Sequence, residues 1–242
     1  MSLAAVFLDG TYEDGDYYVA WALAADLVVA ADGGGGFLAA AGLTPDALVG
    51  DFDSLDEAAV EEARARGARV VRHPVRKDQT DGELAAAEAL RAGAGEIVLA
   101  GALGALDHVL GHLALLGRVE AGGTPARLVA PDLTVRVLTA PAIVSLDAAP
   151  GTRVSLAPLA GDCVVTLAGF AYPLVRGRLP GDACLGLGNA VAAPATPGGR
   201  SGVPLGGQAK IDLHEGRVTV LVASGRESFG GLVLPDLSGV DG

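Results

Sequence analysis

Residues 1–130 alternate short apolar runs with Ala- and Leu-rich stretches of helix length. The apolar runs are Ala4–Leu8, Leu27–Ala31, Ala47–Val49, Arg69–Val71, Ile97–Ala100 and Arg127–Ala130. The stretches of helix length are Asp16–Ala25, Phe37–Ala41, Leu55–Arg66, Thr80–Ala92 and Asp107–Val119. Strands that are apolar throughout and alternate with helices are typical of a parallel sheet covered on both faces. We therefore predict a doubly wound parallel-sheet α/β domain over residues 1–135.

The pattern changes beyond residue 135, where short strand-like runs follow one another without helical stretches. These runs are Val135–Leu138, Thr152–Leu156, Cys163–Leu167, Ala183–Leu187, Ala209–Leu213 and Val218–Val222. Pro and Gly separate them, as in Leu179–Asp182 and the Pro194–Gly207 segment. Closely spaced strands with such turns favour an all-β domain, either an antiparallel β-sandwich or a barrel, over residues 136–223. We expect the Gly-rich residues 224–242 to be a disordered tail.

Two of the expected helices have recognisable start signals. Ser54 precedes the stretch that begins at Leu55, and Glu57 stands three residues after it, as in a capping box. Thr80 is followed by Asp81 and then Glu83, whose negative charges suit the positive end of a helix dipole.

Charge and hydropathy exclude several classes of protein. The net charge is −12 and no long basic run occurs, which argues against binding to a nucleic-acid backbone. The longest apolar stretch, Tyr17–Ala31, is interrupted by Asp26 and is shorter than the roughly 18 residues that a membrane span needs. The first residues lack the basic start and apolar run of a signal peptide, so we expect a cytoplasmic protein.

Aspartates follow nearly every expected strand of the α/β domain. The set comprises Asp9, Asp32, Asp51, Asp53, Asp78, Asp81 and Asp107. Ligands of an open parallel sheet bind beyond the carboxyl ends of its strands, and several acids converging there repel one another unless a cation is present. A hard cation with oxygen ligands, typically Mg²⁺, offsets this repulsion and attracts phosphates. The aspartates therefore predict a magnesium and phosphate site at this edge of the sheet.

Local motifs refine this prediction. In Gly50–Ser54, Asp51 and Asp53 stand two residues apart, and in an extended segment both carboxylates would reach one metal ion. The glycines that follow Asp32 would bring backbone amides close to a bound phosphate. No P-loop and no dinucleotide fingerprint occurs. The i, i+4 pair of His108 and His112 has the spacing of a zinc motif but lacks its glutamate, which favours a structural or substrate-contacting role.

Taken in order, these motifs resemble the thiamine pyrophosphokinase family across nearly the whole chain. The matching segments are Ala31–Gly34, Gly50–Ser54, Lys77–Asp81, Gly104–His108, Val154–Leu159, Gly169–Leu174 and Gly188-Asn189. The last three look like strands of the family's second domain and its Ser-Asn motif. The chain departs from the family pattern at Ala105, where arginine is usual, at His112, where asparagine is usual, and at Gly188, where serine is usual.

The resemblance implies a fold and an activity. The second domain would be a β-sandwich that binds thiamine, and the first would bind ATP and Mg²⁺. The enzyme would transfer diphosphate from ATP to the thiamine hydroxyl, releasing AMP. A homodimer is expected, with each active site between the α/β domain of one subunit and the β-sandwich of its partner. Two alternatives remain open: a related diphosphokinase acting on another heterocyclic alcohol such as a pterin, and a nonenzymatic nucleotide- or thiamine-binding relative.

The resemblance also implies roles for individual residues. Magnesium ligands would be Asp51, Asp53 and Asp81, with Asp78 a further candidate. Asp32, Gly33 and Gly34 would lie along the nucleotide, Lys77 near its phosphates and Thr80 beside it. Asp107 would join Asp51, Asp53 and Asp81 in the catalytic group, with His108 in the same crevice. Asn189 would lie near thiamine. From proximity in the sequence alone, we expect Arg72, Arg76 or Lys77 to replace the charge lost at Ala105.

Overall fold

The computed structural model describes residues 2–53, 55–74, 78–193 and 209–223. These residues form two compact units that divide between Ala130 and Pro131. The expectation of a disordered tail over 224–242 lies outside the described residues. Within the described ranges, no helix is both long and apolar enough to cross a membrane.

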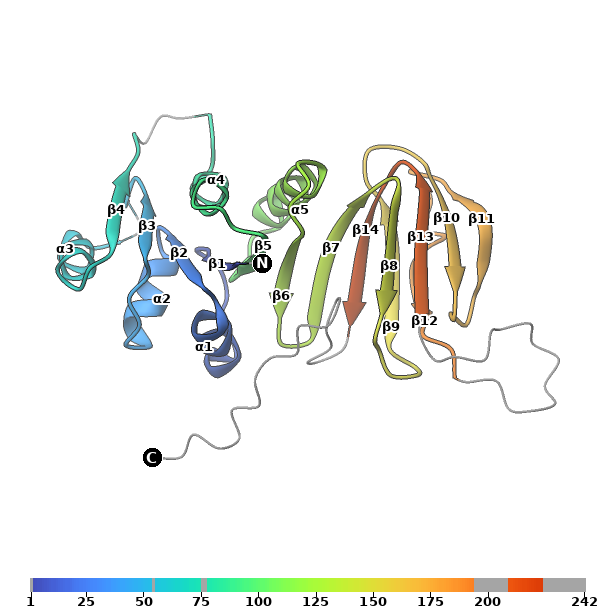
Figure 1. The fold of residues 1–242 in the computed structure, drawn as a ribbon, viewed down its shortest axis with the longest axis horizontal. Coiled ribbons are helices and arrows are strands. Elements are labelled where there is room, and N and C mark those ends of the chain that lie inside the picture. Colours follow the sequence, from blue (N-terminus) through green and yellow to red (C-terminus); the bar gives the residue numbers. More distant parts are fainter. Residues whose placement is uncertain (1, 54, 75–77, 194–208, 224–242) are drawn as a thin grey trace. The chain divides into compact units, whose positions relative to one another are not determined.

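The first unit is built on a sheet of six parallel strands (Figure 1). They are β1 (Leu3–Phe7), β2 (Leu27–Ala31), β3 (Ala47–Gly50), β4 (Arg69–Arg72), β5 (Glu96–Ala100) and β6 (Ala126–Ala130). Their order across the sheet is β6-β5-β1-β2-β3-β4. The chain therefore proceeds outward from β1 to β4 and then returns to the other side of β1. This reversal places a topological switch point between β1 and β5, where such sheets bind ligands.

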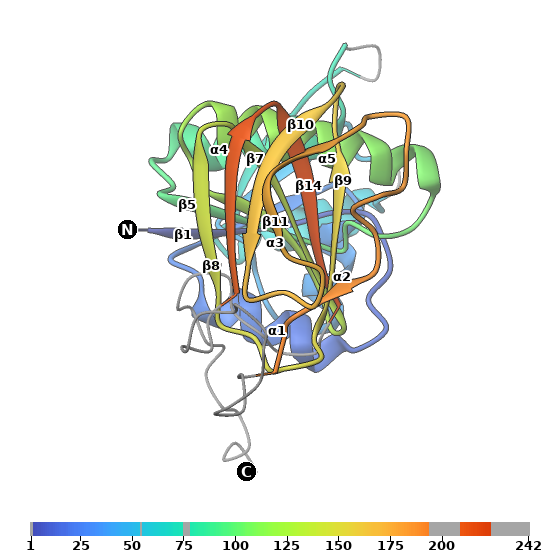
Figure 2. The same cartoon turned by 90° about the vertical axis from the view of Figure 1, so that its right-hand side faces the viewer.

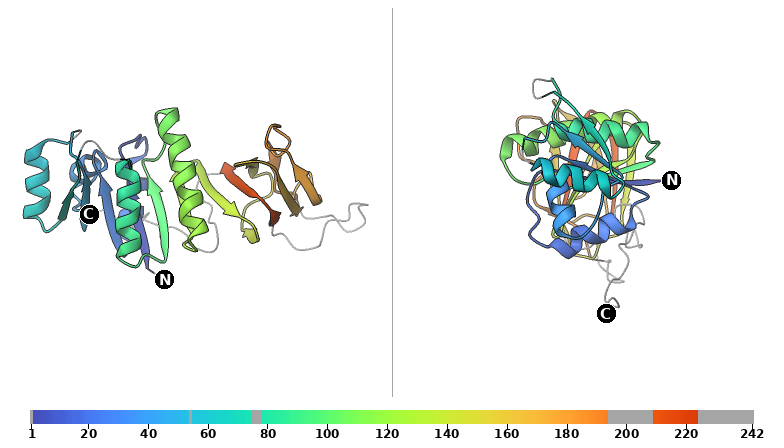
Figure 3. Two further views of the ribbon diagram at one scale, coloured as in Figure 1. Left: turned by 90° about the horizontal axis from the view of Figure 1, so that it is seen from above. Right: turned by 90° about the vertical axis from the view of Figure 1, so that its left-hand side faces the viewer.

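Helices cover both faces of this sheet, as the apolar runs predicted. They are α1 (Gly15–Ala24), α2 (Gly34–Ala40), α3 (Glu57–Ala65), α4 (Asp81–Arg91) and α5 (Leu106–Ala121). Figure 1 shows α4 and α5 on one face and α1 and α2 on the other, and the left panel of Figure 3 looks onto the face with α4 and α5. Tyr18 of α1, Leu38 of α2 and Val60 of α3 share one core cluster with strand residues Phe7 and Leu48. All five residues of β1 are buried, because both of its faces are covered.

The starts of α3 and α4 differ in how well they were predicted. Helix α3 begins at Glu57, with Asp56 as N-cap accepting a hydrogen bond from the Ala58 amide at 3.2 Å. The expected start at Leu55 was therefore wrong, and Ser54 lies outside the described residues. Thr80 does cap α4: its hydroxyl accepts from the Glu83 amide at 3.2 Å, and the Glu83 carboxylate accepts from the Thr80 amide at 2.8 Å. This reciprocal pair is a capping box, which satisfies two amides at the helix start.

The second unit consists of two antiparallel sheets. Its strands are β7 (Leu133–Thr139), β8 (Ala142–Leu146), β9 (Arg153–Pro158), β10 (Cys163–Ala168), β11 (Leu174–Leu179), β12 (Asn189–Ala190), β13 (Ala209–Glu215) and β14 (Arg217–Ala223). One sheet has the order β12-β9-β14-β7 and the other β11-β10-β13-β8. Figure 2 shows β8, β13 and β10 side by side. Alternate residues of both sheets, such as Leu156, Val165, Ile211 and Val220, meet in one buried core.

Three expectations for the second unit were wrong. Ala183–Leu187 is not a strand, and its Leu185 and Leu187 side chains are 65% and 49% exposed. Residues 169–173 precede β11 instead of forming a strand of their own. Strands β8 and β11 and the two-residue β12 were missed. In β11, Arg176, Gly177 and Arg178 interrupt the apolar pattern. An apolar run does not specify a strand unless a neighbouring strand offers it a partner.

Candidate functional site

A pocket of about 520 Å³ opens at the carboxyl ends of the strands of the first unit. It is lined by Leu8, Asp9, Ala31, Asp32, Asp51, Asp53, Gln79, Thr80, Asp81, Gly82, Asp107, His108, Gly111 and His112. Ala31 is the last residue of β2. The other residues follow β1, β2 and β3, lie at the start of α4 from Gln79 to Gly82, or belong to the first two turns of α5. All the acids that the sequence placed at strand ends, except Asp78, therefore meet at the carboxyl edge of the sheet, as parallel strands allow.

Three of these aspartates form the tightest acidic group. Asp32, Asp51 and Asp53 each offer a carboxylate oxygen, and the three oxygens lie within 4.8 Å of one another. Asp32 is buried, Asp51 is half-buried and Asp53 is exposed. Oxygen donors converging at this spacing fit a hard divalent cation such as Mg²⁺, which takes carboxylates and keeps several water ligands. The sequence predicted Asp51 and Asp53 in this group but placed Asp32 along the nucleotide.

The backbone of this acidic group is unusual. Asp32 has φ of 44° and Phe52 has φ of 63°, both in the left-handed region that non-glycine residues rarely adopt. The Asp53 amide donates to the Asp51 carboxylate at 3.2 Å, which closes a tight turn around Phe52. The expectation that Asp51 and Asp53 lie in an extended segment was therefore wrong. Their carboxylates still converge, because the turn reverses the chain between them.

The first turn of α4 supplies another part of the lining. Gln79, Thr80 and Asp81 all face the pocket. Asp78 is exposed and is not among the residues that line it. Lys77, with the neighbouring Arg76, lies outside the described residues. Of Asp78 and Asp81, the two acids of this motif that were predicted as metal ligands, Asp81 lines the pocket and Asp78 does not.

Helix α5 contributes an acid and two histidines. The Asp107 carboxylate accepts a hydrogen bond from the His108 amide at 2.9 Å. His112 Nδ1 lies 2.8 Å from the Ala102 carbonyl oxygen, which can only accept, so Nδ1 carries the hydrogen and Nε2 is left as an acceptor. Burial lowers the pKa of His112, which favours its neutral form.

The two histidine rings are neighbours on α5, with their centroids 6.3 Å apart, and the His112 Nδ1 atom is hydrogen-bonded to a backbone carbonyl. Neither histidine belongs to a group of three potential metal ligands among the described residues. Across the described ranges, the one group of three potential ligands consists of aspartates alone. The prediction that His108 and His112 serve a structural or substrate-contacting role is consistent with this geometry.

The pocket lies almost entirely within a segment that matches the model of a known protein family. The family model described as "Thiamin pyrophosphokinase, catalytic domain" matches residues 20–127. The match spans every lining residue except Leu8 and Asp9. Residues 20–127 of this chain are therefore similar to the catalytic domain of thiamin pyrophosphokinases. A search of curated proteins gave no match.

Solved structures of the thiamin pyrophosphokinase family share the fold. Thiamine pyrophosphokinase from Bacillus subtilis is 23% identical, with a TM-score of 0.74, and the match covers 92% of this chain and 99% of that one. The enzyme from Geobacillus thermodenitrificans is 25% identical, with a TM-score of 0.71 and coverage of 92% and 97%. That from Candida albicans is 13% identical, with a TM-score of 0.73 and coverage of 92% and 89%. The similarity therefore extends over both units.

Of the three departures from the family pattern, the structure explains the one at Gly188 and shows a local contact for the one at His112. Ala105 is the N-cap of α5 and makes no side-chain cap hydrogen bond. Gly188 has φ of 75°, a left-handed conformation in which glycine is less strained than the expected serine. His112 reaches back to the Ala102 carbonyl, which joins α5 to the residues just after β5.

Asn189 belongs to the second unit, and its amide holds a neighbouring loop. Its Oδ1 accepts from the Tyr172 amide at 3.0 Å, and its Nδ2 donates to the Tyr172 carbonyl at 2.9 Å. The Asn189 side chain is buried, whereas Tyr172 is 73% exposed. Asn189 therefore fixes the loop that presents Tyr172, a contact that the sequence did not indicate.

Gly33 and Gly34 lie at the start of α2, where the chain passes close to β1. A Cβ atom on Gly33 would stand 2.1 Å from the Asp9 carboxylate, and one on Gly34 would stand 2.2 Å from the Phe7 carbonyl oxygen. From the sequence, we expected these glycines to bring backbone amides close to a bound phosphate. The structure gives a further reason at Gly34, because no side chain fits there against the backbone of β1, whereas a side chain at Gly33 would have to displace the Asp9 carboxylate.

Asp9 and His112 also line the pocket. Asp9 was among the predicted strand-end aspartates but had no individual role, and His112 was expected only in a structural or substrate-contacting role. Gln79 lines the pocket too and was not predicted.

Proposed function

We propose that the chain is a magnesium-dependent thiamine pyrophosphokinase, which transfers diphosphate from ATP to thiamine. The observation that carries the proposal is the convergence of Asp32, Asp51 and Asp53 within 4.8 Å inside a segment that matches the family's catalytic domain. In this reaction the thiamine hydroxyl oxygen bonds to the β-phosphorus of ATP, and the hydroxyl proton is released to water. The bond between that phosphorus and the oxygen of the α-phosphate breaks, and AMP leaves with the electron pair.

We assign the metal to the acidic group of the pocket. Asp32, Asp51 and Asp53 would hold Mg²⁺, with Asp81 nearby and Asp78 a weaker candidate because it does not line the pocket. When bound, the cation would offset the negative charge of the phosphates. Phosphoryl-type transfer depends mainly on positioning and charge neutralisation, so a rigid acidic pocket suits this chemistry.

Other lining residues would place the substrates. Gly33 and Gly34 would allow close approach of the nucleotide, with Lys77 near its phosphates and Thr80 at the start of α4. Asp107 and His108 would line the far side of the same pocket. His112 supplies an uncharged hydrogen-bond acceptor, Nε2, in a pocket otherwise dominated by carboxylates.

We further propose the division of labour that the family resemblance implies. Residues 1–135 would bind ATP and the cation, and residues 136–223, as a β-sandwich, would contact thiamine through the region of Asn189. The working form would be a homodimer whose active sites combine the two domains from different subunits. We propose a cytoplasmic location and no role for nucleic acid or a membrane.

The choice of acceptor distinguishes this function from its alternatives. Purified protein is incubated with ATP and Mg²⁺ together with thiamine, with a pterin alcohol, or with neither, and AMP is followed by chromatography. We expect AMP release that depends on thiamine. Release with the pterin alcohol alone would identify a different diphosphokinase, and ATP binding without AMP release from any acceptor would identify a nonenzymatic relative.

A further inference from the structure

Phe52 has a backbone conformation that is costly for a bulky residue. It separates Asp51 from Asp53 and has φ of 63°, where the Cβ atom crowds the backbone. Such residues persist when surrounding contacts hold them in place, and they concentrate at functional sites. The turn around Phe52 directs two carboxylates toward one point, so whatever holds Phe52 also sets their spacing.

The Phe52 ring is held from two sides. One side belongs to the core cluster that includes Leu48 of β3 and Val60 of α3, and the residue is only 7% exposed. The Arg72 guanidinium covers the ring from another side, with Cζ 4.8 Å from the ring centroid. A cation at this distance from an aromatic face is attracted by it.

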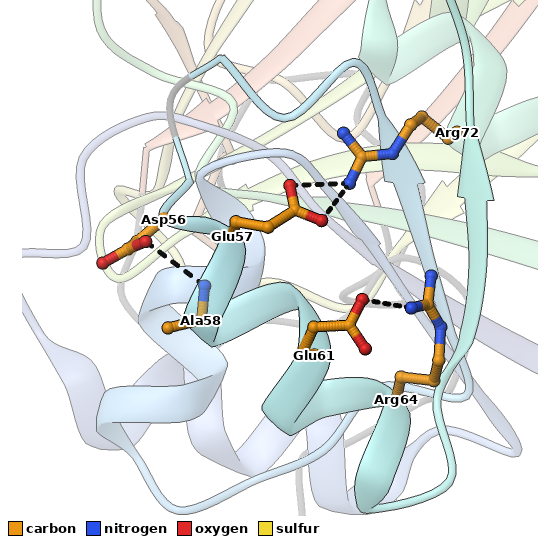
Figure 4. A network of polar contacts seen from close by, with 6 residues as sticks. All are labelled: Asp56, Glu57, Ala58, Glu61, Arg64 and Arg72. Atoms are coloured by element: carbon orange, nitrogen blue, oxygen red, sulfur yellow. Dashed lines mark hydrogen bonds and ion pairs between the residues drawn. The ribbon is translucent and has the colours of Figure 1, made fainter.

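Arg72 is itself held by Glu57. Its Nη2 atom donates to both carboxylate oxygens of Glu57 at 2.8 Å, as Figure 4 shows. Arg72 ends β4, beside Gly50 in register, and Glu57 begins α3. Three elements therefore meet around the turn that carries Asp51 and Asp53.

We propose that Phe52, Arg72 and Glu57 form a brace that positions Asp51 and Asp53 for a divalent cation. The proposal rests on the metal site of the proposed function. It gives Arg72 a role different from the one that the sequence suggested, which was to supply charge to the phosphates. Arg72 is not among the residues that line the pocket, and its guanidinium contacts Phe52 and Glu57.

The direction in which Arg72→Gln changes cation affinity distinguishes a positioning role from a purely electrostatic one. Arg72→Gln removes a positive charge near an acidic site, which by Coulomb attraction alone would strengthen cation binding. A brace predicts the opposite, because Asp51 and Asp53 lose their fixed spacing. We expect the dissociation constant for Mn²⁺, used as a spectroscopic probe of the site, to rise about fivefold, the loss typical of one exposed cation–π contact.

Arg64→Gln is the matched control. Arg64 pairs with Glu61 further along α3, and its side chain is 50% exposed, against 46% for Arg72. Arg64→Gln removes the same charge as Arg72→Gln, but the ion pair that it breaks involves neither Phe52 nor Glu57. Because exposed ion pairs contribute little, the dissociation constant for Mn²⁺ should stay within about twofold of that of the parent. Phe52→Leu, which keeps an apolar side chain in the core but removes the aromatic face, should weaken binding as Arg72→Gln does. Combining Arg72→Gln with Phe52→Leu should weaken Mn²⁺ binding little more than either substitution alone, because the two residues act through one contact.

The experiment also tests the metal site independently of turnover. Mn²⁺ binding is measured without substrates in protein shown to be folded by circular dichroism, with Asp53→Asn included as a site variant. Unchanged or tighter binding in Arg72→Gln, together with weaker binding in Asp53→Asn, would overturn the brace and leave the metal site standing. Undiminished binding in Asp53→Asn would overturn both.

Discussion

Asp53→Asn should lower kcat/KM for thiamine diphosphate formation by about a thousandfold, since losing one metal carboxylate costs about 4 kcal/mol of transition-state stabilisation. A carboxylate oxygen of Asp53 lies within 4.8 Å of one from Asp32 and one from Asp51, and the Asp53 amide closes the turn on Asp51. Asparagine keeps the size of the side chain and its backbone hydrogen bond but removes the negative charge. Steady-state rates over a range of Mg²⁺ concentrations measure the loss.

Asp78→Asn is the matched comparison for this prediction. Asp78 is also an acid of a family motif, but it is exposed and does not line the pocket. We expect its substitution to reduce kcat/KM by about tenfold or less, as is usual for a charge that acts from outside the site. Near-normal activity in Asp53→Asn, or equal losses in the two variants, would contradict the assignment of the metal to Asp32, Asp51 and Asp53.

Gly34→Ala should destabilise the α/β unit by about 3 kcal/mol, near the upper end of typical overpacking costs. The added Cβ atom would stand 2.2 Å from the Phe7 carbonyl oxygen and 2.5 Å from its carbonyl carbon. Both are backbone atoms of β1, which lies in the middle of the parallel sheet. Relief would require α2 to move away from the sheet. Urea denaturation followed by circular dichroism measures the change.

Gly36→Ala, two residues further along the same helix, should have the opposite sign. A Cβ atom there would make an ordinary contact, at 3.6 Å from Leu55 Cδ1. Alanine is favoured over glycine within a helix by about 1 kcal/mol, so the variant should be slightly more stable than the parent. Equal effects of the two substitutions would show that the glycines do not differ in their fit against β1.

The α/β unit could be predicted because its strands are buried on both faces. A run such as Ala4–Leu8 is apolar throughout only when helices cover the sheet on two sides, and the structure places α1 and α4 there. Thr80 was recognisable as a helix start from the residues that follow it, and the structure adds a complete capping box. The acids converge because parallel strands end on the same edge, which requires no knowledge of side-chain positions.

The details that fix the site depend on tertiary contacts. The left-handed turn at Phe52 is stabilised by Arg72 and by the core, and these neighbours are distant in sequence. Asp32 joined the acidic group because its own left-handed backbone follows β2 beside β3. In the second unit, Ala183–Leu187 has the composition of a strand but lies outside both sheets, with Leu185 exposed. Strand formation there depends on partners that a local pattern does not encode.

The most direct measurement is the identity of the products formed from ATP, Mg²⁺ and thiamine. We expect AMP and thiamine diphosphate in equal amounts, with the formation of both abolished by EDTA. ADP with thiamine monophosphate would contradict the transfer of diphosphate, and absence of turnover by folded protein that binds ATP would contradict thiamine as the acceptor.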